Sequence, residues 1–127
     1  MLGAQMILVV EDDAANRDYA ITVLGDQGYE IETVGSAEEA LRLLSRRTPD
    51  LILMDIQLPG MDGLELTRRL KADPDTAAIP IVAMTGQTMP IHQRAAMAAG
   101  CAGFIQKPVT PADLTAEVNT HINAREV

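Results

Sequence analysis

The chain has 127 residues, which suits one domain of ordinary size and leaves no room for a second. Hydrophobic residues make up 47% of it, enough to bury a core, and because aromatic residues are nearly absent that core must be mostly aliphatic. The net charge of -8 argues against direct binding to nucleic-acid phosphates, which requires many Lys and Arg residues. The first apolar run, residues 6–10, is too short for a signal peptide or a membrane span.

The cysteine content indicates the cellular compartment. The single Cys101 excludes an internal disulfide and suits a reducing environment. No neighbouring motif would lower the pKa of its thiol, so we expect Cys101 to be a small buried hydrophobe and not a nucleophile. We therefore expect a cytoplasmic domain without a membrane segment.

Five short apolar runs recur along the chain. They cover residues 6–10, 30–34, 51–54, 79–84 and 103–105. These runs are too short for helices, and most are rich in β-branched residues, so we predict that they are buried strands.

Helical stretches lie between and after these runs. They cover residues 14–27, 36–46, 62–72, 91–99 and 110 to about 125. Ser36 with Glu39, and Asp62 with Glu65, have the spacing of a capping box at a helix start. Thr110, followed by a proline, is predicted to be the N-cap of the last helix.

Strands that alternate with helices predict a parallel sheet with helices on both faces. The chain shows no internal repeat, linker or low-complexity segment. We therefore expect one doubly wound α/β domain of the (βα)5 type over residues 1–127, with about residues 5–125 ordered.

Polar residues follow four of the predicted strands, at the sheet edge where open α/β sheets bind their ligands. They are Glu11, Asp12 and Asp13 after the first strand, Asp55 after the third, Thr85 after the fourth and Lys107 after the fifth. Any one of them alone is more often a turn residue than a ligand. Turn chemistry alone does not explain why all of them stand at the ends of four separate strands.

The gathered carboxylates indicate a cation. Two carboxylates ~4 Å apart repel each other by roughly 4 kcal/mol at an effective dielectric constant near 20. Lys107 offsets only part of this repulsion, and Mg²⁺ is a hard cation that typically uses one or two carboxylates together with water and phosphate oxygens. One carboxylate then remains free as a nucleophile that can form an acyl phosphate. The metal, Lys107 and Thr85 would hold the phosphoryl oxygens.

Four segments resemble the receiver domains of two-component response regulators, of the single-domain, stand-alone type. They are residues 7–13 (ILVVEDD), 53–63 (LMDIQLPGMDG), 81–86 (IVAMTG), and 99–100 with 103–108 (AG and GFIQKP). The resemblance covers essentially the whole chain with its spacings in register. It implies a flavodoxin-like fold with the strand order 2-1-3-4-5.

The same resemblance implies a role for each site residue. Asp55 would be the phosphoacceptor, and Mg²⁺ would be bound by Asp12, by Asp55 and by the backbone carbonyl of Gln57. Glu11 would reach the metal mainly through water, whereas Asp13 falls one position past the acidic pair and is expected to cap a helix.

The remaining roles concern the switch. Thr85 would hydrogen-bond a phosphoryl oxygen, and Lys107 would pair with the same group, positioned by a cis peptide bond to Pro108. Phe104 occupies the position of the switch aromatic and would move inward with Thr85. Without the resemblance, Phe104 would be interpreted as an ordinary core ring.

The implied function is a phosphoacceptor switch that catalyses its own phosphorylation and dephosphorylation but turns over no outside substrate. The donor would be a histidine kinase or a histidine phosphotransfer protein. A downstream protein partner would bind the face made by the fourth helix, the fifth strand and the fifth helix, with no direct contact to nucleic acid or membrane.

A few positions depart from the usual pattern or stand apart from it. Gly86 stands where Ala is usual, and Pro90 precedes the fourth helix, where it is expected to restrict the conformations of the loop. Gln57 and Gln87 follow Asp55 and Thr85 by two residues and are expected to tune the lifetime of the acyl phosphate. Both histidines are expected on helix surfaces and not as phosphodonors.

Two other functions are compatible with the same architecture. A flavin-binding electron carrier would cradle phosphate after the first strand, where this chain has an acidic run that repels it. A Mg²⁺-dependent aspartyl phosphatase would need a second Asp two residues after the nucleophile, where this chain has Gln57. Within the receiver hypothesis, a stand-alone regulator, a phosphate shuttle and a hybrid-kinase receiver remain open, and the early first strand favours the first.

Overall fold

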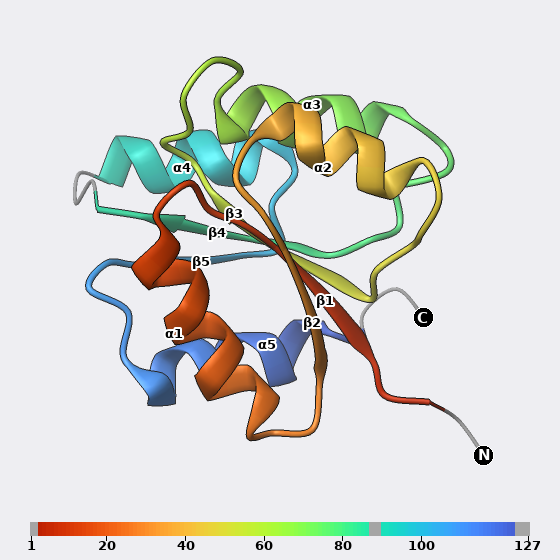
Figure 1. Cartoon of the computed structure of the whole chain (residues 1–127). Helices are drawn as coiled ribbons and strands as arrows, with labels where there is room; N and C mark the ends of the chain where they lie inside the picture. The colour runs from red at the N-terminus through yellow and green to blue at the C-terminus, as the bar shows by residue number, and fades with distance from the viewer. Residues whose placement is uncertain (1–2, 87–89, 124–127) are drawn as a thin grey trace.

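The computed structural model describes residues 3–86 and 90–123, and within them five parallel strands form one sheet in the order β2-β1-β3-β4-β5. The strands are β1 (Met6–Val10), β2 (Glu30–Val34), β3 (Leu51–Asp55), β4 (Ile81–Thr85) and β5 (Gly103–Gln106). The helices are α1 (Ala14–Gly25), α2 (Ala37–Leu44), α3 (Gly63–Ala72), α4 (Pro90–Ala99) and α5 (Pro111–His121) (Figure 1). The predicted doubly wound α/β fold and its strand order are confirmed.

The sheet is covered by helices on both faces, with α2, α3 and α4 on one side and α1 and α5 on the other (Figure 1). Alternate residues of each strand pack against the helices on opposite faces of the sheet, because successive side chains of a strand point in opposite directions. In β1, Met6, Leu8 and Val10 pack with α2, α3 and α4, whereas Ile7 and Val9 pack with α1 and α5. The strand is therefore apolar throughout, as a doubly covered parallel strand must be.

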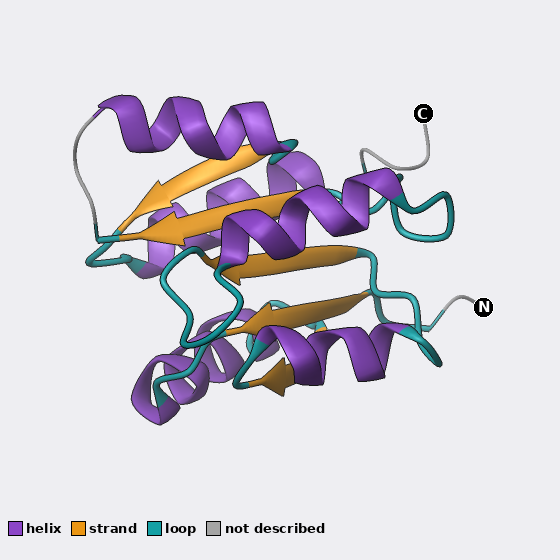
Figure 2. Cartoon of the chain, turned by 90° about the horizontal axis from the view of Figure 1, so that it is seen from above, coloured by secondary structure: helices purple, strands orange, loops and turns teal. Residues whose placement is uncertain are grey.

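All five strands point the same way, so their carboxyl ends share one edge of the sheet (Figure 2). The loops β1–α1, β3–α3, β4–α4 and β5–α5 leave from that edge. Ile56, just after β3, donates its backbone N–H to the carbonyl of Met84 at 3.0 Å, which ties the ends of β3 and β4 together. Side chains that follow these strands are thus held at one place by the sheet itself.

The predicted helix caps are present. The side chains of Ser36, Asp62 and Thr110 each accept a hydrogen bond from the backbone N–H three residues later, at 3.2, 2.8 and 3.1 Å. The capping box at Ser36 is incomplete, because the Glu39 carboxylate accepts from Gly35 N–H at 3.4 Å and not from Ser36. These caps begin the helices at the sheet edge that carries the site.

Several predicted boundaries differ from the structure by a few residues. β4 begins at Ile81 and not at residue 79, because Pro80 has no N–H to donate to the sheet. α1 ends at Gly25 and not at residue 27, and the chain then turns through Gly28, whose φ is 93°. α5 ends at His121, short of the predicted end near residue 125, which lies outside the described residues.

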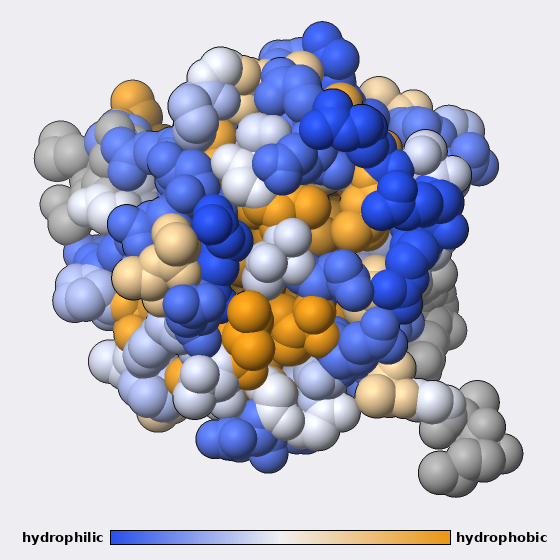
Figure 3. Space-filling view, viewed as in Figure 1, coloured by the Kyte–Doolittle hydropathy of each residue, from blue (hydrophilic) through white to orange (hydrophobic). Residues whose placement is uncertain are grey.

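The surface is polar on most of the face seen in Figure 3, with apolar atoms in the middle, where β2 forms the sheet edge between α1 and α2. Arg47 lies near this edge and pairs with Glu30 at 2.9 Å and Glu32 at 3.3 Å. No helix in the described parts of the chain is both long and apolar enough to cross a membrane.

Candidate functional site

The loop after β1 carries the acidic residues that the sequence singled out. Glu11 is buried, with 2% of its surface exposed, and its backbone N–H donates to Val34 O at 3.0 Å. Its carboxylate accepts a hydrogen bond from Asp13 N–H at 3.2 Å, whereas Asp12 is exposed. Asp13 caps α1 by accepting from Asn16 N–H at 3.1 Å, so its predicted role as a helix cap is confirmed.

Asp55 is the last residue of β3 and is 3% exposed. One carboxylate oxygen, Oδ1, accepts a hydrogen bond from Gln57 N–H at 2.9 Å. The other, Oδ2, lies 3.2 Å from the ammonium nitrogen of Lys107. The carboxylate is therefore held in a fixed direction at the carboxyl ends of the strands. Nearby residues also screen it from most of the solvent.

Lys107 follows β5 and reaches across two strand ends. Its Nζ lies 3.1 Å from Glu11 Oε1 and 3.2 Å from Asp55 Oδ2. Burial opposes the charge on Lys107, but its hydrogen bond to Glu11 and the charges of Asp55 and Glu11 outweigh it, so the pKa of Lys107 lies above its ordinary value. The Lys107–Pro108 peptide bond is cis, as the resemblance implies.

Glu11, Asp12 and Asp55 together can hold a metal ion. One carboxylate oxygen from each lies within 4.8 Å of the other two. Three carboxylates at such distances repel one another strongly, and the ion pairs of Lys107 reach only Glu11 and Asp55. An oxygen-only donor set with one exposed member, open to water, fits the needs of Mg²⁺.

Thr85 ends β4 at the same edge and is fully buried. Its backbone carbonyl accepts a hydrogen bond from Lys107 N–H at 2.8 Å, so the residues after β4 and β5 are joined directly. Gly86 is exposed, and a Cβ added there would meet nothing within 4 Å, which leaves space beside Thr85. Gln87 and the residue before Pro90 lie outside the described residues.

The side chains of the other predicted residues form no hydrogen bond or ion pair with the carboxylates of the site among the described residues, although the backbone N–H of Gln57 donates to Asp55. Phe104 is partly buried against the core beneath α2, α3 and α4, and Gln57 has an exposed side chain. Both histidines are partly buried, so the expectation of helix-surface positions holds only in part. His121 lies 3.5 Å from Glu117, one turn away on α5.

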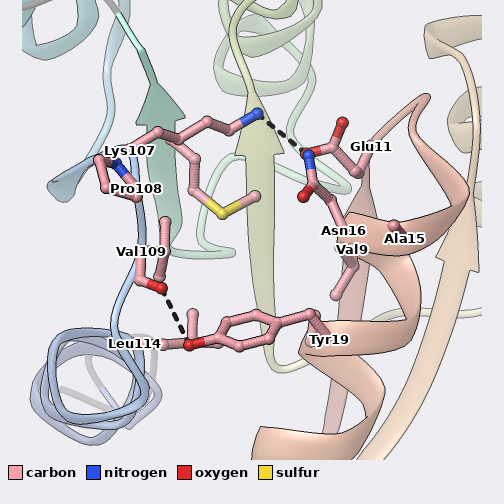
Figure 4. A pocket seen from close by; sticks show the side chains of 11 residues that line it. Val9, Glu11, Ala15, Asn16, Tyr19, Lys107, Pro108, Val109 and Leu114 are labelled. Carbon is pink, nitrogen blue, oxygen red and sulfur yellow. Dashed lines mark hydrogen bonds and ion pairs between the residues drawn. The ribbon is translucent and has the colours of Figure 1, made fainter.

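A pocket of about 330 Å³ opens beside the carboxylates, between α1 and the β5–α5 loop. Val9, Met84 and Leu114 are among its apolar lining residues, while Lys107 and Glu11 face each other across its polar end (Figure 4). At its other end the hydroxyl of Tyr19 donates to the backbone carbonyl of Val109 at 2.9 Å (Figure 4). This hydrogen bond ties α1 to the loop that carries Lys107.

Three residues shape the site without having been singled out from the sequence. Arg17 donates to the backbone carbonyl of Glu11 at 2.8 Å, and Tyr19 holds Val109. Gly63 donates its N–H to Ile56 O at 2.9 Å, and a Cβ on Gly63 would lie 2.8 Å from Ile56 Cα. Only Gly63 carried a signal in the sequence, because it falls in a segment that resembles the family pattern.

Comparisons with known proteins agree with this arrangement. The family model described as the response regulator receiver domain matches residues 7–119. The chain is 34% identical over 122 residues to the DNA-binding response regulator MtrA of Mycolicibacterium paratuberculosis (96% of this chain, 53% of MtrA). It is 38% identical over 104 residues to the polar-differentiation response regulator DivK of Brucella ovis (82% and 85%). The chain thus spans about half the length of the MtrA proteins but most of DivK.

A solved receiver domain has the same architecture. It belongs to the sensor histidine kinase PA1611 of Pseudomonas aeruginosa PAO1 and is described with a magnesium ion coordinated in its active-site cleft. It superposes with a TM-score of 0.87 at 30% identity and covers 95% of this chain and 99% of its own. The strand order, the site at the carboxyl edge and the match over residues 7–119 lead to one conclusion. The chain belongs to the response regulator receiver domain family.

Proposed function

We propose that Asp55 is the phosphoacceptor of this domain and that its phosphorylation depends on Mg²⁺. The observation that carries the proposal is the environment of its carboxylate, which Lys107 contacts at 3.2 Å at the same edge as Glu11 and Asp12. Oδ1 accepts from Gln57 N–H, so the position of the nucleophile is fixed before a donor arrives.

Mg²⁺ would be bound by Asp12, by Asp55 and by the backbone carbonyl of Gln57. Glu11 would act through water, because its carboxylate already contacts Lys107 and Asp13 N–H. The magnesium ion described for the active-site cleft of the PA1611 receiver domain supports a Mg²⁺ site at this edge of the sheet. When bound, the ion would neutralise charge on the phosphoryl oxygens.

Thr85 and Lys107 would hold the other phosphoryl oxygens. Thr85 ends β4, and Lys107 is joined to it through the backbone at 2.8 Å, so both would respond together to a group on Asp55. Phe104 lies on β5, a strand of the partner face, and would move inward with Thr85. These movements would change the surface made by α4, β5 and α5.

The donor would be a histidine kinase or a histidine phosphotransfer protein. The phosphoryl group would pass from the phosphohistidine nitrogen to an Asp55 oxygen, breaking the P–N bond and forming a P–O bond. Water would later attack the phosphorus and release inorganic phosphate from the carboxylate. The domain would thus catalyse only its own phosphorylation and autodephosphorylation.

A downstream protein partner would bind the α4–β5–α5 face. Two large apolar side chains of α4, Ile91 and Met97, are 58% and 45% exposed and would be available to an apolar surface of the partner. The net charge of -8 disfavours direct contact with nucleic acid. Equal partner affinity for the phosphorylated and unphosphorylated protein would contradict this role of the face.

Phosphorylation can be tested by intact mass spectrometry after incubation with acetyl phosphate, with and without Mg²⁺. The parent is expected to gain one phosphoryl group only when Mg²⁺ is present, and Asp55→Asn is expected to gain none. Thr115→Ala, a substitution on α5 away from the carboxylates, serves as the matched control and is expected to behave as the parent does.

A parent that gains no mass while it binds Mg²⁺ would be examined with beryllofluoride, which mimics the acyl phosphate and does not hydrolyse. Mg²⁺-dependent binding of beryllofluoride to the parent but not to Asp55→Asn supports Asp55 as the acceptor. Failure of both reagents would overturn the proposal.

A further inference from the structure

Arg17 lies in the first turns of α1 and contacts the main chain of the acidic loop that precedes the helix. Its Nη1 donates to the backbone carbonyl oxygen of Glu11 at 2.8 Å. Helical side chains lean towards the N-terminus, so this position can reach back to the loop. A charge-assisted hydrogen bond of this length is among the stronger contacts that a loop carbonyl can make.

The guanidinium lies beside Gly35, the residue after β2. A Cβ on Gly35 would lie 3.4 Å from Arg17 Nη1 and 3.5 Å from Glu39 Oε1. The backbone N–H of Glu11 donates to the carbonyl of Val34, directly before this glycine, at 3.0 Å. Both backbone polar groups of Glu11 are therefore fixed, the N–H by β2 and the carbonyl by Arg17.

We propose that Arg17 is a positioning residue that sets how Asp12 and Glu11 face the Mg²⁺ site. Because the peptide unit is planar, fixing the Glu11 carbonyl also fixes the direction in which the chain enters Asp12. Asp12 is exposed, so its carboxylate depends on its backbone for orientation. This inference rests on the proposed metal ligands and adds a residue that acts on them through the main chain.

A positioning role and a purely electrostatic role of Arg17 predict opposite changes in Mg²⁺ affinity when Arg17 is replaced by a neutral residue. If Arg17 acted only as a nearby positive charge, a neutral residue would strengthen the attraction of the three carboxylates for Mg²⁺. If Arg17 holds the loop, the same replacement weakens Mg²⁺ binding, because the ligands lose their orientation. The direction of the change therefore separates the two roles.

The test is a calorimetric titration of the full chain with Mg²⁺, for the parent and three variants. Arg17→Ala is expected to weaken binding by roughly 10-fold, the scale on which residues that orient metal ligands act. Arg17→Lys keeps the positive charge and a donor group at the end of the side chain and is expected to recover part of the affinity. Arg46→Ala removes an exposed arginine that follows α2 and lies at the amino ends of the strands, opposite the site. This variant is expected to bind Mg²⁺ as the parent does.

Circular dichroism of each variant without Mg²⁺ reports whether it is folded. If Arg17→Ala does not fold, Arg17→Gln is used as the neutral variant in its place. Equal or tighter Mg²⁺ binding by the folded neutral variant would overturn the positioning role and leave the proposed function standing. A parent that binds no Mg²⁺ would overturn both.

Discussion

The ammonium nitrogen of Lys107 lies 3.2 Å from a carboxylate oxygen of Asp55, although 52 positions separate the two residues in the sequence. The parallel sheet brings them together, because β3 and β5 flank β4 and all three strands end at the same edge. Lys107 also contacts Glu11 at 3.1 Å, so one cation bridges the ends of three strands. The same geometry places three carboxylates that repel one another beside one ammonium group that attracts two of them.

Lys107→Met is expected to destabilise the metal-free domain by about 2 kcal/mol, because it removes the donor shared by two buried carboxylates. Added Mg²⁺ supplies positive charge at the same carboxylates, so the loss is expected to shrink in its presence. Urea denaturation with EDTA and with Mg²⁺ measures both quantities. An identical loss under the two conditions would show that Lys107 does not act on the charges of the metal site.

Asp12→Asn is expected to have opposite effects with and without metal. It removes one of three carboxylates that lie within 4.8 Å of one another, so the metal-free domain is expected to unfold at a higher temperature. Mg²⁺ affinity is expected to fall at least ~10-fold, since a direct ligand is lost. Thermal unfolding in EDTA and a Mg²⁺ titration measure the pair of effects. Asp18→Asn, at an exposed position of α1, is the matched control. The same rise in unfolding temperature in that variant would refute relief of repulsion at the metal site as the cause.

Gly63→Ala is expected to destabilise the domain by about 1–3 kcal/mol, the range for overpacking a rigid site. The new Cβ would clash with the backbone carbonyl of Asp55 and lie 2.8 Å from Ile56 Cα, and backbone atoms cannot turn aside as a side chain can. Gly25→Ala is the control, because nothing lies within 4 Å of its Cβ position. Urea denaturation compares them, and equal stability of the two variants would mean that the loop after β3 adapts freely.

Cys101 is expected to make stability depend on pH. Burial raises the pKa of its thiol, so between the unfolded and the folded pKa the native state keeps a proton that the unfolded state has lost. The stability linked to this group is full below the unfolded pKa and declines as pH rises above it. The unfolding free energy of the parent relative to Cys101→Ala should therefore fall from about pH 7 to about pH 9.5.

Urea denaturation of the two proteins at both pH values checks this prediction. Lys71, whose pKa burial lowers, is present in both proteins, so its direct contribution largely cancels in the comparison. A difference that stays constant or grows with pH would contradict the assigned burial of the thiol.

The sheet and the ends of its strands could be predicted because the pattern is local. Each strand is a short apolar run, and Asp55, Thr85 and Lys107 stand at or just after strand ends, where topology alone gathers them. The start of β4 could not be placed from the apolar pattern alone, since residues 79–84 are apolar throughout, whereas the strand begins at Ile81, after a proline that has no N–H to donate.

The residues that support the site were harder to predict. Arg17 acts through a backbone carbonyl, and because every residue has one, the sequence does not indicate which carbonyl Arg17 contacts. Tyr19 meets Val109 across 90 positions, a contact set by how α1 packs beside the β5–α5 loop. Such contacts depend on tertiary packing, whereas the acidic residues themselves follow directly from strand position.

The central claim is that Asp55 alone accepts the phosphoryl group, and borohydride reduction tests it most directly. Borohydride converts an aspartyl phosphate into homoserine, and peptide mass spectrometry then identifies the position. After incubation with acetyl phosphate and Mg²⁺, we predict homoserine at position 55 and at no other acidic residue, and none when Mg²⁺ is withheld. Homoserine at Asp12, or 5-hydroxynorvaline (the product that a reduced glutamyl phosphate gives) at Glu11, with Asp55 unchanged, would contradict the account.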